Sequence, residues 1–188
     1  MSLSIAAAVA GVVFAIAPAF AATIVPVAHF QSIELEGGGH ITVRHGDVQQ
    51  LRLLEGSTAF TRFFVEEAGK LRVETCKNDC PNHYDLEVEI VTPRIRALAI
   101  SGGGATETAG EFPRREDLTV AIDGGGTIDA RAIDAVMATT AINGGGIIKI
   151  KAEGNLTAAI DGGGEIRYWG DPHVTSAIDG GGKVERGN

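Results

Sequence analysis

The feature that most constrains the fold is a six-residue phrase that occurs five times in the second half of the chain. The phrase reads Ala-Ile-X-Gly-Gly-Gly, where X is Ser, Asp or Asn. Its copies are residues 99–104, 121–126, 141–146, 159–164 and 177–182. Successive copies begin 22, 20, 18 and 18 residues apart. A repeat of about 20 residues is typical of structural units that cannot bury an apolar face alone and therefore stack on one another.

The residues before each glycine triplet predict a β-strand with one buried face. Leu118, Val120 and Ile122 alternate with more polar residues, which is the two-residue period of a half-buried strand. Three glycines suit a sharp corner, because glycine reaches positive φ without a steric clash at Cβ. Stacking of equivalent strands would align one inward isoleucine from each repeat. These isoleucines are Ile100, Ile122, Ile142, Ile160 and Ile178.

Charged residues on the outward side of the following strand support the same alignment. Stacking would place Asp129 beside Lys149 and Arg167 beside Glu185 on adjacent strands. We therefore expect an all-β fold, a parallel β-helix or solenoid with coils of 18–22 residues. Right-handed winding is the default for parallel crossover connections.

The chain divides into an export signal and one domain. An apolar run and the small residues Ala19 and Ala21 predict a signal peptide over residues 1–21, although the usual basic start is missing. Residues 22–188 then form a single β-solenoid domain with no transmembrane segment. Its strands are irregular over 22–97 and regular over 98–188. We expect an exported protein that is periplasmic, associated with the cell surface, or secreted.

The first part of the domain contains one further glycine corner, at residues 37–39, about three coil lengths before Gly102. Cys76 and Cys80 are the only cysteines of the chain. In an exported protein a close pair favours a disulfide that fixes a loop. A metal site formed by Cys76, Cys80 and His83 is the alternative, but it lacks a fourth ligand.

Two outward columns of the repeat are the candidate binding residues. The first is a flat strip of alanines: Ala99, Ala121, Ala141, Ala159 and Ala177. Such a strip favours a docking surface for a glycan, a sister subunit or an envelope protein. The alternatives are that a loop such as residues 114–117 covers it, or that small residues merely suit tight stacking.

The second column precedes the glycines and consists of Ser101, Asp123, Asn143, Asp161 and Asp179. Such side chains favour corners, because they hydrogen-bond the nearby backbone. Asp161 and Asp179 are adjacent carboxylates and thus a candidate for a divalent cation, although no metal or other cofactor is required by the pattern.

Several motifs together resemble the head GIN domain family of putative autotransporter adhesins. They are Phe30-Gln31-Ser32-Ile33 with its glycine corner, Lys70-Leu71-Arg72-Val73, the lead-in Thr92 to Leu98, and the repeated corners such as Ala141-Ile142-Asn143-Gly144. The resemblance covers roughly residues 30–186. It implies a β-helical fold and an exported, envelope-associated protein, and it brings no catalytic motif.

These observations favour a non-enzymatic, adhesin-like binding head whose flat strand face meets a glycan or an envelope partner. A net charge of −8 argues against nucleic acid as a partner. One alternative is a structural envelope homo-oligomer that assembles through the open edge of the last strand. The other is a polysaccharide-degrading enzyme, for which the sequence offers only the Asp161 and Asp179 pair and five scattered histidines.

Overall fold

All regular secondary structure in the described part of the protein is β-strand. The computed structural model describes residues 22–76 and 80–188, so the predicted signal peptide lies outside the described residues. The strands in chain order are β1 (Thr23–Ile24), β2 (Ser32–Gly37), β3 (His40–His45), β4 (Gln50–Glu55), β5 (Thr61–Val65), β6 (Lys70–Thr75), β7 (Glu87–Thr92), β8 (Ala97–Gly102), β9 (Ala105–Ala109), β10 (Arg115–Gly124), β11 (Thr127–Gly144), β12 (Ile147–Gly162), β13 (Glu165–Trp169), β14 (His173–Asp179) and β15 (Lys183–Arg186).

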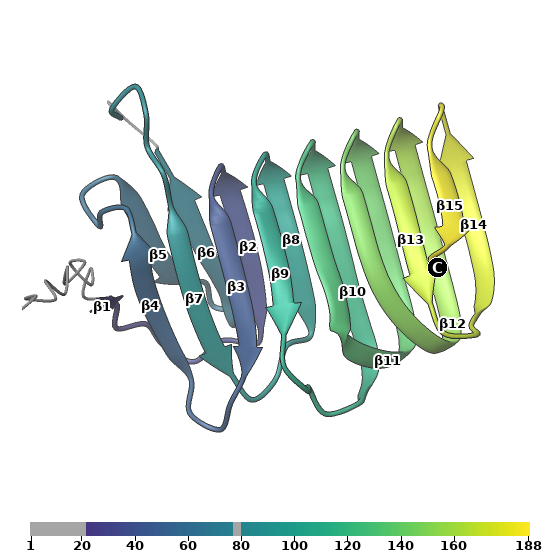
Figure 1. The fold of residues 1–188 in the computed structure, drawn as a ribbon, viewed down its shortest axis with the longest axis horizontal. Helices are drawn as coiled ribbons and strands as arrows, with labels where there is room; N and C mark the ends of the chain where they lie inside the picture. The colour runs from purple at the N-terminus through teal and green to yellow at the C-terminus, as the bar shows by residue number, and fades with distance from the viewer. Residues whose placement is uncertain (1–21, 77–79) are drawn as a thin grey trace, which may run out of the picture.

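The strands form one 15-stranded sheet that curls over itself. Its main order is β1-β4-β7-β3-β9-β11-β10-β8-β2-β6-β5, and β12 to β15 extend it beyond β11. The curl is made by strands that belong to both layers. The start of β11 pairs with β9, whereas its end pairs with β10. Figure 1 shows the two resulting layers, with β3, β7, β9 and β13 in front of β2, β6, β8 and β14.

The predicted parallel β-helix or solenoid with coils of 18–22 residues is wrong. The sheet is mixed, because β4 pairs antiparallel with both β1 and β7, and β5 pairs antiparallel with β6. In addition, β11 and β12 run unbroken through the bend for 18 and 16 residues. The glycine phrase encodes the register between neighbouring strands, which is a local property. The hairpins of the first third are set instead by turns such as residues 66–69, where the Gly69 N–H donates to the Glu66 carbonyl at 2.9 Å.

The register that the phrase predicts is nevertheless confirmed between the later strands. Ile122 lies opposite Ile100 on one side and Ile142 on the other. Ile160 likewise lies between Ile142 and Ile178. All these pairs are parallel. The first four isoleucines of this column are at most 3% exposed, so it forms a continuous part of the core.

The glycine corner at residues 37–39 lies directly beside the first copy of the repeated phrase, residues 99–104, rather than three coils away from it. Strand β2 pairs with β8, and Gly37 lies opposite Gly102. The intervening chain builds β4 to β7 on the far side of β2 and β3. Apolar matching accounts for this placement, because Ile33 and Leu35 continue the buried columns of Leu98 and Ile100.

The glycine corners form a row along one edge of the molecule, at the top of Figure 1. Gly124, the first glycine of the corner at residues 124–126, has a φ of 123°, and a Cβ there would lie 2.4 Å from the Gly102 carbonyl oxygen. The Gly125 N–H donates to that same oxygen at 2.9 Å. The corners are thus bonded to one another, and a side chain at the first position would separate them.

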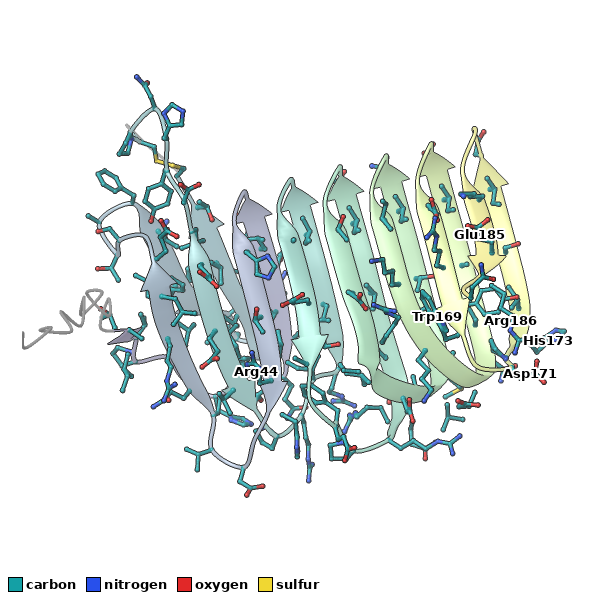
Figure 2. All side chains as sticks on the ribbon, in the orientation of Figure 1. Arg44, Trp169, Asp171, His173, Glu185 and Arg186 are labelled. Atoms are coloured by element: carbon teal, nitrogen blue, oxygen red, sulfur yellow. A yellow bond between two sulfur atoms is a disulfide. The ribbon has the colours of Figure 1, made fainter. Side chains whose placement is uncertain are left out.

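The sheet ends at β14 and β15 within the described residues. Strand β14 pairs only with β12, and β15 pairs only with β13. Ile178 is therefore 44% exposed, although its equivalents on the preceding strands are buried. Figure 2 shows Trp169, Glu185 and Arg186 grouped near this end, with Asp171 and His173 at the outer margin.

Candidate binding groove

The repeated phrase builds a surface groove on the outer face of β8, β10, β11, β12 and β14. Ala121 lies opposite Ala99 and Ala141, and Ala159 continues the column to Ala177. The alanines form the floor of a groove with a volume of about 650 Å³. We call this feature the alanine groove.

The alanine column is open along most of its length. Ala141, Ala159 and Ala177 are exposed, whereas Ala99 and Ala121 are half-buried. The segment proposed as a cover, residues 114–117, does not form a separate loop over the column, because Arg115 already begins β10. Methyl groups at successive strands therefore make a flat apolar floor accessible from outside.

The second predicted column forms one rim of the alanine groove. Its members are in register from Ser101 to Asp179, and Asp123, Asn143, Asp161 and Asp179 are exposed. The Asn143 side-chain amide donates to the Asp123 carboxylate at 3.2 Å. This bond separates Asp123 from the other two carboxylates and orders that part of the rim.

The cation candidate at Asp161 and Asp179 consists of two carboxylates on adjacent strands. Within residues 22–76 and 80–188, no group of three or more His, Cys, Asp or Glu side chains is arranged to hold a metal ion. A calcium ion takes six to eight oxygen ligands, so two carboxylates alone make a poor site.

A row of threonines next to the alanines escaped the sequence analysis. Thr119, Thr139, Thr157 and Thr175 are exposed, lie opposite one another on successive strands, and stand two residues before each alanine. The signal was present in the sequence, because every repeat from the second onward carries threonine at this position. The outer face thus shows three parallel columns: threonine, alanine, and an Asp/Asn column that begins with Ser101.

Charged residues close the end of the alanine groove that lies toward β2. Glu34 lies opposite Ala99 and forms an ion pair with Lys70 at 2.5 Å. The hydrogen bond to Glu34 raises the pKa of Lys70 above its usual value, against the opposing effect of burial. Arg72 contacts Glu36 and lies 2.9 Å from Glu66. This cluster ends the flat floor with paired charges.

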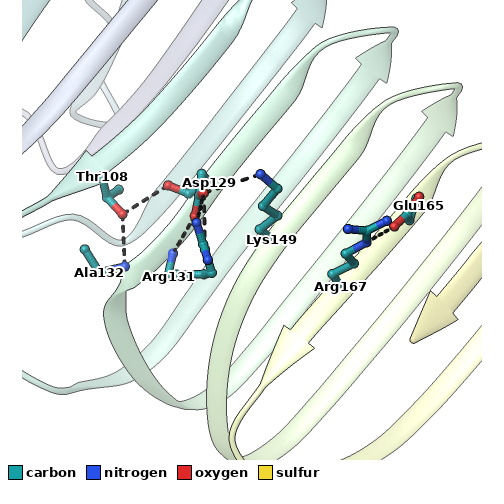
Figure 3. A network of polar contacts seen from close by, with 7 residues as sticks. All are labelled: Thr108, Asp129, Arg131, Ala132, Lys149, Glu165 and Arg167. Atoms are coloured by element: carbon teal, nitrogen blue, oxygen red, sulfur yellow. Dashed lines mark hydrogen bonds and ion pairs between the residues drawn. The ribbon is translucent and has the colours of Figure 1, made fainter. Parts of the chain in front are cut away.

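The opposite layer carries ion pairs instead of an apolar floor. The two predicted cross-strand pairs are confirmed, with 3.7 Å between Lys149 and Asp129 and 3.3 Å between Arg167 and Glu185. Arg131 also binds Asp129 at 2.7 Å, and Arg167 contacts Glu165 on its own strand. Figure 3 shows the contacts of Asp129 with Arg131 and Lys149, and the contact between Arg167 and Glu165.

These contacts shift the acidity of two carboxyl groups. Burial opposes the charge of Asp129, but the hydrogen bonds from Arg131 and the charges of Arg131 and Lys149 outweigh it and lower the pKa of Asp129. Burial also opposes the charge of Glu165, and hydrogen bonds from Arg167 and Lys183 lower its pKa. Both carboxylates are held ionised by neighbouring cations, as expected of structural ion pairs.

The only tryptophan of the chain is a packing residue rather than a stacking platform. The Arg131 guanidinium lies 4.8 Å from the centre of the Trp169 ring, and the indole N–H donates to the Asn188 carbonyl at 3.2 Å. Gly187 also lies against the ring, since a Cβ there would be 2.2 Å from Trp169 Cε2. Trp169 therefore joins β13 to the end of the chain.

The predicted disulfide is confirmed between Cys76 and Cys80. Both thiolates are consumed by this bond, so the alternative metal site with His83 is excluded for the oxidised protein. Cys76 directly follows β6, and the segment from Cys80 to the start of β7 projects beyond the row of corners in Figure 1. Tyr84 fixes this segment, because its hydroxyl lies 2.7 Å from Thr61 Oγ1 and accepts the Ser57 N–H at 2.8 Å.

Comparisons with known proteins agree with this architecture. Residues 114–172 match the family model described as "Putative auto-transporter adhesin, head GIN domain". The resemblance to the head GIN domain family is confirmed over this segment. The segment includes all of β10, β11 and β12, and three of the five repeated glycine corners lie at the ends of these strands. No curated protein matches the chain at a significant level.

Two solved structures are similar to this chain. A putative adhesin from Bacteroides fragilis is 15% identical with a TM-score of 0.55, and the alignment covers 88% of this chain and 95% of that protein. A putative adhesin from Parabacteroides merdae is 15% identical with a TM-score of 0.45, covering 89% and 96% of the two chains. The similarity to the Bacteroides fragilis protein shows that the two proteins share a fold over most of this chain.

Proposed function

We propose that the protein is a non-enzymatic, adhesin-like binding protein whose alanine groove receives an extended glycan of the cell envelope or cell surface. The observation that carries the proposal is the open, apolar floor that crosses five strands and is lined by regular polar columns. The head GIN match supports an adhesin-like role, because the family is described in those terms.

The chemistry of the groove suits a carbohydrate. Pyranose rings present apolar C–H faces and a hydroxyl edge, which match a methyl floor beside Asp, Asn and Thr side chains. The columns repeat at the strand spacing of about 4.8 Å. An extended glycan has a similar repeat per sugar, so successive sugars would meet equivalent groups on successive strands. Many small contacts of this kind give binding through repetition rather than through one deep pocket.

The same arrangement offers little to a hydrolytic reaction. The acidic column contains no Lys, Arg or His. Glycoside hydrolases combine a proton donor of raised pKa with a second carboxylate. Asp123, Asp161 and Asp179 are all exposed on the rim of an open surface groove. We therefore propose binding without turnover.

We also propose that the protein is exported and works in the periplasm, at the cell surface or outside the cell. The disulfide supports an oxidising compartment. No helix among the described residues is both long and apolar enough to cross a membrane. Fractionation of the native host, with immunodetection of the chain in periplasm, envelope and medium, tests this; recovery in the cytoplasm alone would contradict export.

The binding proposal is tested with immobilised cell-envelope and surface glycans. The full chain should bind at least one of them, and the variant Ala141→Glu/Ala159→Glu should lose at least tenfold in affinity. Both alanines are exposed, so the variant should fold. The matched control is Thr127→Glu/Ile147→Glu, which makes the same charge change on adjacent strands of the opposite layer.

Equal binding by the groove variant and the wild type would overturn the alanine groove as the site. Release of sugar products would instead show turnover. Binding to an envelope protein but to no glycan would place a protein partner on the same face, and the same pair of variants would report it.

A further inference from the structure

We propose that two copies of the chain form a symmetric dimer by antiparallel pairing of their β14 strands. Within the described residues, the outer edge of β14 pairs with no other strand, so its backbone N–H and C=O groups on that side are free to bind another strand. Ile178, Ser176 and Val174 continue the inward columns of the core, and at β14 no further strand covers them. Ile178 is 44% exposed, whereas the equivalent Ile160 is 3% exposed.

A second copy of β14 matches this edge in one particular register. In an antiparallel pair, residues directly opposite each other lie on the same face, and a slip by one residue would turn inward residues outward. The registers that keep the faces aligned are therefore centred on a single residue. Centring on Ser176 pairs all seven residues of β14.

Hydrogen-bonding and size complementarity favour this register. Centring on Ser176 places His173 opposite Asp179 of the second copy, and the symmetry makes the same pair twice. The imidazole can donate a hydrogen bond to the carboxylate. Val174 meets Ile178 on the inner face, which removes both from water. In this register, the turn before β14 of one copy (residues 170–172) lies opposite the glycine corner at 180–182 of the other copy. The glycines carry no side chain that would obstruct this approach.

The neighbouring registers are less favourable. A shift that centres the pair on Thr175 places Asp171 opposite Asp179 twice, and both are exposed carboxylates. A shift that centres the pair on Ala177 places Ser176 opposite Ile178 and leaves His173 beside the glycine corner. Like charges directly opposite each other destabilise a strand pair. The register centred on Ser176 is thus specified by residues of β14 and by Asp171 just before it.

Arg186 limits the strength of the contact. Strand register places it over Tyr168, in a column that faces the core, and its guanidinium lies 3.6 Å from Asp171. A charge at such a position weakens pairing of the adjacent edge. The dimer is therefore expected to form through β14 and to be concentration-dependent. It would place two alanine grooves on one continuous face and so give the assembly two binding surfaces.

The first test is the mass of the full chain in solution, measured by light scattering and sedimentation over a wide concentration range. The expected result is a reversible change from one chain to two. Ser176→Lys should shift the midpoint to at least tenfold higher concentration, because it places two ammonium groups on the symmetry axis. Thr157→Lys on β12 is the matched control and should leave the midpoint unchanged.

Exchange of the paired charges tests the register. His173→Asp and Asp179→His should each weaken the dimer, since each places like or unmatched groups opposite one another. The double variant His173→Asp/Asp179→His restores the complementary pair and should recover dimerisation. A change that merely disturbed folding would not be reversed by the second substitution.

Covalent trapping gives a second readout. The Cα atoms of opposite residues in an antiparallel pair are about 4.5–5.5 Å apart, within reach of a disulfide. Ser176→Cys should therefore form a disulfide-linked dimer on oxidation, and Thr157→Cys should not. A chain that stays monomeric at all concentrations would overturn the proposal. Growth into filaments, or failure of the charge exchange to restore the dimer, would also overturn it.

Discussion

At the scale of single residues, the three glycines of each corner are not equivalent. The first glycine needs a positive φ and lies against the corner of the preceding strand. The third glycine also faces a close neighbour, since a Cβ on Gly126 would lie 2.7 Å from Ile100 Cγ2. The middle glycine, Gly125, has open space around its Cβ direction. The corner therefore requires glycine at its first and third positions, where a side chain would meet different neighbours. Neither contact exists at the second position, so glycine is not required there.

This difference predicts unequal effects of the same substitution. Gly124→Ala should lower the free energy of unfolding by about 1–3 kcal/mol, because a side chain at such a φ is strained. The contact of the added Cβ with the Gly102 carbonyl oxygen should increase this loss. Gly125→Ala should change it by less than about 0.5 kcal/mol. Thermal unfolding followed by circular dichroism checks both, and equal losses would contradict the described corner geometry.

Asp129 gives a residue-scale prediction for pH. Its pKa is lower in the folded protein than its ordinary value of 3.8, because Arg131 and Lys149 outweigh the effect of burial. A carboxyl of this kind stabilises the fold when ionised. The contribution is complete above the ordinary value and is lost as pH falls through the lowered one.

Asp129→Asn should therefore lower the free energy of unfolding at neutral pH by about 0.5–1 kcal/mol, as for a well-placed surface ion pair. The difference from wild type should shrink as the pH falls below 3.8. Denaturant titrations at several pH values measure it. Arg131→Gln should show the same trend, and a difference that grows in acid would contradict the assignment.

At the scale of elements, the position of a strand in the sheet decides how much its core residue contributes. Ile142 and Ile178 occupy the same place in the repeat. Ile142 is 2% exposed between two neighbouring strands, whereas Ile178 is 44% exposed at the edge. The same deletion of methyl groups should therefore have different costs at the two positions.

Ile142→Ala should lower the free energy of unfolding by about 2–4 kcal/mol, as for large-to-small substitutions in a packed core. Ile178→Ala should lower it by less than about 1 kcal/mol when measured at a protein concentration where the chain is monomeric. Equal losses at the two positions would show that the last strand is covered in solution and would contradict the exposed edge.

At the scale of the whole molecule, the sequence predicts the contacts between repeated strands but not the pairing of strands outside the repeat. The isoleucine column, the alanine column and the ion pair between Asp129 and Lys149 follow from counting residues between glycine corners. The position of β2 beside β8 does not, because 65 residues separate Gly37 from Gly102 and nothing in the spacing says that the chain returns. Only the matching of apolar columns across β2 and β8 fixes that neighbour.

The hairpin formed by β5 and β6 shows the same limit. Residues 61–65 read Thr-Arg-Phe-Phe-Val and show no alternation of polar and apolar residues, and their antiparallel direction relative to β6 is set by the turn at 66–69. The threonine column could have been predicted, because threonine recurs two residues before the alanine in every repeat from the second onward. The more regular glycine triplets were the stronger signal in the same repeats. The groove was only partly predictable, since its closed end depends on Glu34 and Lys70 from distant segments.

The central claim is that β2 and β8 are in-register parallel neighbours, because this pairing creates one continuous face from segments far apart in sequence. Oxidation of the variant Glu36→Cys/Ser101→Cys tests it most directly, since these two positions lie opposite each other. We expect an intramolecular disulfide, visible as a mass loss of two hydrogens and one crosslinked peptide. We expect none for Glu36→Cys/Asp123→Cys, whose positions are two strands apart. Crosslinking in the second variant and not in the first would contradict the in-register pairing of β2 with β8.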